Sequence, residues 1–231
     1  MDRLFTLFRQ HFGRDHKYVR PLTGSASNRQ YFRLSDDETS CVGVLGVNPD
    51  ENRTFIAMAA HFRAQGIAVP EVYAVSEDAV AYIQEDLGDT ALFGIVGSEG
   101  SEELLCRTVR CLPDIQFKGA DGFDFSVCHS VCRFDRRLVL FDLNYFKYCF
   151  LKPSGLEFDE NRLQDDFERL ADDLTSVKTD TFMYRDFNAR NVMIKDGSPC
   201  FIDFQGGMQG PIYYDVASFV WHARAGYSQN L

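Results

Sequence analysis

The 231-residue chain has no excess of basic residues. It contains 24 Lys and Arg against 34 Asp and Glu, which gives a formal net charge of −10 at pH 7. Proteins that bind duplex nucleic acid usually carry a basic stripe, so this balance argues against a nucleic-acid partner. A nucleotide ligand is still compatible with it, because a few local cations and metal ions can hold phosphates.

Long apolar runs are also missing. No segment approaches the ~18 residues that a membrane-spanning helix needs, and charges interrupt the N-terminal segment over residues 1–9. That segment lacks a small-residue cleavage site, so we interpret it as a surface helix and not a signal peptide. The seven cysteines are odd in number and lack zinc-knuckle spacing. We therefore expect free thiols in a cytoplasmic protein that has no membrane partner.

Internal repeats and low-complexity segments are absent too. With 45% hydrophobic and 25% charged residues, the composition is that of an ordinary globular protein. The length predicts one or two domains, or one domain with two lobes.

The first ninety residues are predicted to form a mostly antiparallel sheet with one inserted helix. Asn48 and Pro49 are typical of a helix start, and Gly66 is typical of a helix end. Apolar residues recur between them at the spacing of one buried helical face: Phe55, Met58, Ala59 and Phe62. Strand-like segments lie on either side of this helix, at 31–34, 41–45, 69–75 and 79–84.

After Asp89 the pattern becomes mainly helical. Residues 138–151 are apolar with a helical period, and Asp159 can cap the helix that follows. The last helix begins near Tyr214 and runs into the C-terminus. Two short strands with a hairpin turn between them are embedded in this part, at 192–194 and 200–204.

These patterns predict an α+β class with two lobes. A β-rich N-lobe would occupy residues 1–88. A mainly helical C-lobe with an embedded hairpin would occupy residues 89–231.

The segment 184–192 contains Asp186 and Asn191, an Asp and an Asn separated by four residues. The spacing alone is weak evidence, but the pair leads into a strand, and Asp203 follows twelve residues after Asn191. Phosphoryl transfer needs one carboxylate to accept the proton of the attacking hydroxyl and two oxygen ligands to hold Mg²⁺ against the phosphates. The alternative is that Asp186 and Asn191 cap turns and that Asp203 ends a strand.

The chain resembles the aminoglycoside phosphotransferase/choline kinase family, which are small-molecule relatives of the protein kinases, over nearly its whole length. The resemblance is specific in the block 186–215. It implies a two-lobed protein-kinase-like fold, with Asp186 as the catalytic residue and with Asn191 and Asp203 as Mg²⁺ ligands. Asp215, in Gly-Pro-Ile-Tyr-Tyr-Asp, is implied to steady the catalytic loop.

The segment Gln-Glu-Asp-Leu-Gly-Asp at 84–89 resembles the linker between the lobes of this family. The resemblance implies that the linker backbone, at Glu85 and Leu87, contacts the adenine of ATP. Residues 21–34 look most like the anomeric sugar kinases, which phosphorylate N-acetylmuramate and N-acetylglucosamine.

A phosphate loop is expected over residues 23–29, where small residues let backbone N–H groups approach phosphates. The candidate nucleotide-binding residues there are Gly24, Ser25, Ala26, Ser27, Asn28 and Arg29. The loop has a single glycine and no Gly-Lys-Ser/Thr, so it is not a P-loop. The alternative is an ordinary hairpin turn.

The sequence departs from protein kinases at the ion pair of the third strand and its helix. The segment 41–47 contains no Lys, and the helix that follows has only Glu51, at its start. Both members of the pair are therefore expected to be absent. Arg29 or Arg33 is a candidate substitute, and each could equally be a solvated surface charge. Tyr184 occupies the place of the catalytic-loop His.

A second departure is one of size. Only eight residues lead from Asp203 to Pro211, and no Ala-Pro-Glu follows, so the platform that docks a protein substrate is missing. The resembling kinases also continue for several helices beyond the position of Leu231, and we expect an incomplete acceptor site. Candidates for its remaining surface are Asn144, Tyr145 and Arg224, although we expect Tyr145 in the core.

The expected function is ATP- and Mg²⁺-dependent phosphorylation of a small hydroxyl compound, with a sugar such as N-acetylmuramate or N-acetylglucosamine as the first candidate. An aminoglycoside-type antibiotic kinase is one alternative. A regulatory, nucleotide-binding pseudokinase is another, which the missing Lys–Glu pair favours and the Asp186, Asn191 and Asp203 set opposes. The oligomeric state stays open.

Overall fold

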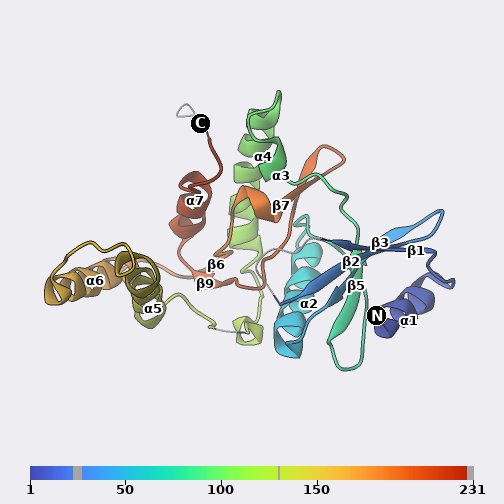
Figure 1. Cartoon of the computed structure of the whole chain (residues 1–231), viewed down its shortest axis with the longest axis horizontal. Helices are drawn as coiled ribbons and strands as arrows, with labels where there is room; N and C mark the ends of the chain where they lie inside the picture. The colour runs from blue at the N-terminus through green and yellow to red at the C-terminus, as the bar shows by residue number, and fades with distance from the viewer. Residues whose placement is uncertain (23–27, 130, 228–231) are drawn as a thin grey trace.

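The computed structural model describes residues 1–22, 28–129 and 131–227, and a five-stranded antiparallel sheet forms one end of it (Figure 1). The strands follow the order β1-β2-β3-β5-β4. Their bounds are Tyr18–Leu22 for β1, Gln30–Ser35 for β2, Ser40–Leu45 for β3, Val72–Val75 for β4 and Ala81–Glu85 for β5. Together with the helical remainder of the chain, this sheet confirms the predicted α+β class.

Two predicted strands are shorter than expected. β4 begins at Val72 and not at residue 69, because Pro70 has no N–H to give to a ladder. β5 begins at Ala81 and not at residue 79, because Ala79 has a φ of 56°, in the left-handed region.

One helix covers each face of the sheet. α1 (Asp2–Phe12) buries Leu4, Leu7 and Phe8 against it. α2 (Pro49–Ala64) lies on the opposite face (Figure 1). The Asn48 side chain caps α2 by accepting hydrogen bonds from two backbone N–H groups. The four apolar residues predicted to form its inner face are all buried, which confirms that prediction.

The rest of the chain is mainly helical. α5 and α6 pack on each other at the end of the molecule farthest from the sheet (Figure 1). In chain order the helices are α3 (Leu92–Ile95), α4 (Ser101–Pro113), α5 (Arg136–Phe146), α6 (Glu160–Thr175) and α7 (Ile212–Val220). Short turns lie between or extend them: η1 (Asp114–Lys118), η2 (Phe125–Val127), η3 (Lys147–Leu151) and η4 (Ala189–Asn191). Within the described residues, no helix is both long and apolar enough to span a membrane.

The helical period predicted at 138–151 is confirmed, but the Tyr145 side chain, which was expected in the core, faces solvent. Tyr145 is 66% exposed. α5 buries Leu138 and Val139 instead and packs that face against α6. Asp159 caps α6 as predicted. α7 starts two residues before Tyr214 and ends at Val220, so it does not run to the C-terminus.

Two small antiparallel pairs lie in the helical part. β6 (Thr181–Met183) pairs with β9 (Met208–Gly210), and β7 (Val192–Lys195) pairs with β8 (Ser198–Phe201) in the predicted hairpin. β8 stops at Phe201, so Asp203 lies beyond the strand that was expected to carry it. Asp203 has a φ of 66°, which a regular strand does not allow.

The largest core cluster joins the sheet, α2 and the C-terminal part. Phe62 of α2 packs edge-on against Phe182 of β6 and against Phe204, with ring centroids 4.9 and 5.3 Å apart. All three side chains are fully buried. The same aromatic contacts therefore join α2 to the segments that carry the predicted site residues.

Candidate functional site

A cleft of about 640 Å³ lies between the sheet and the C-terminal part. Six residues predicted for the site line it: Arg29, Glu85, Leu87, Asp186, Asn191 and Asp203. Asn28 is exposed and is not one of the lining residues. The other four predicted phosphate-loop residues, Gly24, Ser25, Ala26 and Ser27, lie outside the described part of the chain.

Asp186 lies on the loop after β6, and a buried carboxylate fixes this loop. Asp215 accepts hydrogen bonds from the backbone N–H groups of Tyr184 (3.0 Å) and Arg185 (2.9 Å) and from the Gln116 side chain (3.2 Å). Arg185 has a φ of 73°, a conformation that needs such outside support. The Tyr184 hydroxyl also donates to the carbonyl of Ile202, next to Asp203. The loop conformation is thus set by groups that surround it.

Two side-chain amides hold the Asp186 loop from the other side. The Nδ2 groups of Asn191 and Asn188 both donate to the carbonyl oxygen of Asp186, at 2.9 and 3.0 Å. The Asn191 Nδ2 is thereby engaged within the loop, which leaves its amide oxygen as the atom to offer a cation.

The segment after β8 passes directly beside Asp186. A Cβ on Gly206 would lie 3.5 Å from the Asp186 Oδ2. The Oδ1 of Asp203 accepts a hydrogen bond of 2.8 Å from Gln205. The two carboxylates predicted for catalysis and for metal binding therefore line the same end of the cleft.

The pKa of Asp186 is raised above its ordinary value. Burial is the main cause, the neighbouring Asp203 carboxylate adds to it, and the Arg185 guanidinium opposes it. A raised pKa makes a carboxylate a better proton acceptor at neutral pH. Two like charges in one recess also create a site that favours a cation.

The donor set at Asn191 and Asp203 fits Mg²⁺. Both residues offer hard oxygen atoms, and Mg²⁺ commonly uses one or two carboxylates together with substrate phosphates and water. Within the described residues, no group of three or more His, Cys, Asp or Glu side chains could hold a metal by protein ligands alone. The described residues therefore fit a Mg²⁺ ion that binds together with a nucleotide.

The lining of the cleft also includes a set of apolar side chains, here called the apolar slot. Apolar residues from both sides line it: Leu22, Val42, Leu87, Met193 and Ile202. Gln84 also lines the cleft, is only 8% exposed, and has no hydrogen-bond partner for its Oε1 among the described residues. The Leu87 N–H likewise takes part in no hydrogen bond within the described part of the chain. An apolar slot with a few polar groups suits a flat heterocycle such as a purine base.

Ion pairs tie the linker at 85–89 to both sides of the cleft. Arg33 pairs with Asp86 at 2.6 Å and with Asp89 at 2.8 Å. Glu85 pairs with Lys195 of the β7–β8 hairpin. Arg33 is therefore not the solvated surface charge that the sequence left open. The Glu85 side chain is also occupied, so any nucleotide contact at this residue falls to its backbone.

A different ion pair links the cleft to α2, although β3 carries no lysine. Glu51 pairs with Arg29 at 3.1 Å, and the Arg29 side chain is 4% exposed. Sequence reasoning named both residues but did not connect them. An Arg in a segment of small residues and an acid in a first helical turn were the available signals.

Several cleft residues were not predicted, including Tyr82, Arg190 and His222. Tyr82 is fully buried, and β5 carries it on the same face as Gln84. Arg190 lies inside the predicted loop, with its guanidinium 4.7 Å from the centroid of the Phe93 ring. Charged residues within the motif were the signal that could have identified Arg190.

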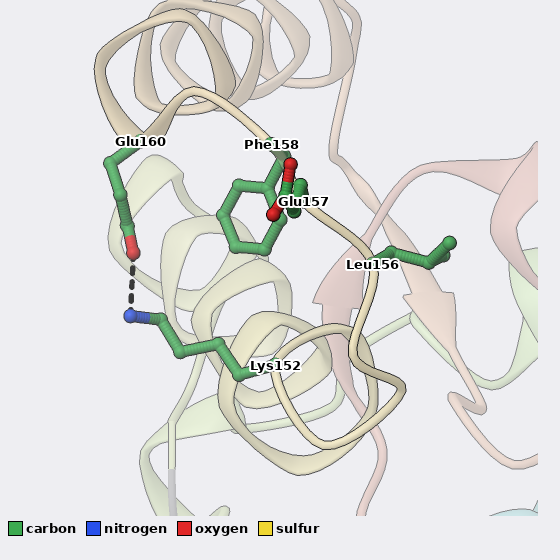
Figure 2. Close-up of a pocket in the computed structure, with 5 residues that line it drawn as sticks. All are labelled: Lys152, Leu156, Glu157, Phe158 and Glu160. Carbon is green, nitrogen blue, oxygen red and sulfur yellow. Dashed lines mark ion pairs between the residues drawn. The ribbon is translucent and has the colours of Figure 1, made fainter.

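A second hollow lies between η3 and α6 and holds none of the predicted residues. It has a volume of about 460 Å³ and is lined by Lys152, Leu156, Glu157, Phe158 and Glu160 (Figure 2). Two of its charged groups pair with each other, since Lys152 and Glu160 are 2.5 Å apart. The acceptor candidates Asn144, Tyr145 and Arg224 do not line the cleft either.

The fold is that of the kinase-like phosphotransferases. A thermostable mutant of aminoglycoside phosphotransferase APH(4)-Ia, solved with AMP-PNP and hygromycin B, aligns with a TM-score of 0.65 over 94% of this chain and 75% of that chain, at 16% identity. Spectinomycin phosphotransferase APH(9)-Ia, solved with ADP and spectinomycin, aligns with a TM-score of 0.61 over 93% of this chain and 71% of that chain, at 14% identity.

The model of the phosphotransferase enzyme family matches residues 19–231, and the chain belongs to that family. Its sequence is 26% identical over 201 residues to N-acetylmuramate/N-acetylglucosamine kinase of Pseudomonas aeruginosa and 28% identical over 207 residues to the enzyme of that name in Neisseria meningitidis. These matches cover 85% and 84% of this chain, and 57% and 58% of those proteins. The chain thus spans little more than half the length of these relatives.

Proposed function

We propose that this chain carries the nucleotide-binding and catalytic residues of an ATP-dependent phosphotransferase that acts on a hydroxyl of a small molecule. The observation that supports it most is the meeting of Asp186, Asn191 and Asp203 with the linker at 85–89 around a single cleft. The proposed substrate is an N-acetylated amino sugar such as N-acetylmuramate or N-acetylglucosamine. The names of the curated relatives support this finer assignment.

In the proposed mechanism, Asp186 orients the acceptor hydroxyl and accepts its proton. Asn191 and Asp203 hold Mg²⁺, which supplies charge neutralisation on the phosphates when bound. Of the predicted phosphate loop, Arg29 lines the cleft and would face the phosphates. Most of the rate acceleration comes from alignment and charge neutralisation, and no covalent enzyme intermediate is needed.

The base of ATP is proposed to occupy the apolar slot. The backbone groups of Glu85 and Leu87 would meet its hydrogen-bonding edge. The Leu87 N–H, unused among the described residues, supports this placement. In this interpretation residues 1–88 form the nucleotide-binding lobe and residues 89–231 form the catalytic lobe.

The test is ADP release from Mg-ATP across a panel of acceptors. The panel holds N-acetylmuramate, N-acetylglucosamine, simple hexoses, choline and an aminoglycoside. Turnover should require an N-acetylated sugar and should fall about 100-fold or more in Asp186→Asn, because the proton acceptor is removed. Asp196→Asn is the matched control, because Asp196 is exposed at the tip of the β7–β8 hairpin, away from the cleft lining.

The other outcomes separate the competing functions. Turnover with the aminoglycoside alone would favour an antibiotic kinase. ATP binding without turnover on any acceptor would favour a pseudokinase. A chain that binds no nucleotide would refute the proposal.

A further inference from the structure

Arg29 and Glu51 form an ion pair in the wall of the cleft. Arg29 lies just before β2, and Glu51 lies in the first turn of α2. The Nη2 of Arg29 is 3.1 Å from the Oε1 of Glu51, and the two side chains are 4% and 30% exposed. A guanidinium keeps its charge inside proteins and is costly to bury without a counter-charge. Glu51 therefore allows a permanent cation to be held in the wall of the cleft.

The pair connects to Asp203 through contacts along α2. Phe55 follows Glu51 by one helical turn, and the Arg29 guanidinium is 5.8 Å from the centroid of its ring. The Phe55 ring stacks on Phe204 with centroids 4.8 Å apart and an interplanar angle of 11°. Phe204 directly follows Asp203, so α2 holds Arg29 and the predicted metal ligand in one packed unit.

The other basic side chain that the sheet contributes to the cleft has a different task. Arg33 lines the cleft as well, but it is bound to Asp86 and Asp89 of the linker. β3 supplies no lysine. Arg29, just before β2, is thus a cleft-lining cation that pairs with α2.

We propose that Arg29 and Glu51 take the place of the absent third-strand lysine and its helix glutamate, a proposal that rests on the proposed function. Arg29 contacts the phosphates of the nucleotide, and Glu51 is a positioning residue that holds the guanidinium toward them. A guanidinium carries five N–H donors, so it can contact a phosphate and keep its contact with Glu51. The pair is specific to the phosphate end of the nucleotide and does not touch the base.

The test is calorimetric binding of Mg-ATP, ADP and adenosine, without an acceptor. Arg29→Ala should weaken ATP binding about 10- to 100-fold, the effect of losing hydrogen bonds to a charged group, and should change the Kd of adenosine less than about twofold. Arg29→Lys should restore part of the loss, which keeps the test valid if the alanine variant does not fold. Glu51→Gln should weaken ATP binding less than Arg29→Ala does, again without affecting adenosine.

A double-mutant cycle tests the positioning role directly. Because Glu51 acts through Arg29, Glu51→Gln should cost nothing further in the Arg29→Ala background. The matched control is Asp50→Asn, one residue earlier on α2, where the carboxylate is 74% exposed and pairs with Arg53. This control should bind ATP like the wild type.

Three results would overturn the proposal. An equal loss of adenosine and ATP affinity in Arg29→Ala would mean that the pair only supports the fold. A full effect of Glu51→Gln in the Arg29→Ala background would mean that Glu51 does not act through Arg29. Unchanged ATP binding in Arg29→Ala would remove the phosphate contact while leaving the proposed function intact, whereas a wild-type chain that binds no nucleotide would refute the proposed function itself.

Discussion

Substitution of Asp215 by Asn should make the stability of the protein less dependent on pH in the acidic range. Asp215 is fully buried beneath the loop that carries Asp186. Burial raises its pKa from 3.8 to about 6, although its hydrogen bonds to Tyr184, Gln116 and Arg185 act in the opposite direction. This difference corresponds to about 3 kcal/mol between the two protonation states.

The sign follows from linkage. The folded protein binds the Asp215 proton more tightly than the unfolded chain does, so ionisation of this group destabilises the fold above pH 6. That cost is relieved as the pH falls from about 6 toward 4. The wild type should therefore gain up to about 3 kcal/mol relative to Asp215→Asn between pH 7 and pH 4.

The assay is urea unfolding followed by far-UV circular dichroism at several pH values. Asp166→Asn, an exposed position on α6, is the control for the loss of one carboxylate. Asp215→Asn should also reduce turnover more than ATP affinity. Asp215 accepts a hydrogen bond from the loop that carries Asp186, but Asp215 itself does not line the cleft. A flat difference between wild type and Asp215→Asn across this pH range, or one of opposite sign, would refute the reasoning.

Three further substitutions test the packing and the ion pair that support the site. Phe62→Ala removes a fully buried ring between two other aromatic rings, and should lower the free energy of unfolding by about 3–5 kcal/mol in urea titrations; a loss below about 1 kcal/mol would contradict the packing described. Gly207→Ala would bring a Cβ within 2.2 Å of the Phe182 ring, so it should lower the free energy of unfolding by about 1–3 kcal/mol. An unchanged thermal midpoint would show that the loop can accommodate the extra methyl group. Lys195→Gln breaks the ion pair with Glu85, in which the Lys195 and Glu85 side chains are 38% and 19% exposed. The free energy of unfolding should fall by at most about 1 kcal/mol, and a larger loss would contradict the small contribution expected of an exposed ion pair.

Local signals explain what could be read from the sequence. Asn48 and Pro49 start a helix through their own chemistry, and the β7–β8 turn is specified by its own residues. The Asp186-to-Asn191 spacing likewise belongs to one short loop. Such features depend only on residues close together in the sequence, so they can be predicted without knowledge of the fold.

Features that depend on distant partners could not be read in this way. The helical period at 138–151 fixes which residues share a face, but the contact with α6 decides which face is buried, and Tyr145 falls on the other one. Apolar residues continue past Phe201, yet β8 ends there because the chain turns into a left-handed conformation at Asp203. The pairing of Arg29 with Glu51 exists only because β2 and α2 come together in space.

The aromatic contacts shared by α2 and the C-terminal part set the order in which the chain can complete its fold. All five strands of the sheet lie within the first 85 residues, but Phe55 stacks on a ring 149 positions later in the sequence, that of Phe204. As the chain leaves the ribosome, Phe55 and Phe62 of α2 therefore lack their contacts with Phe204 until that residue has been made. Contacts over such separations slow folding and expose apolar surface in the meantime. The sheet with α2 is consequently a poor candidate for an autonomous module, and nucleotide binding should emerge only when the catalytic segments are in place.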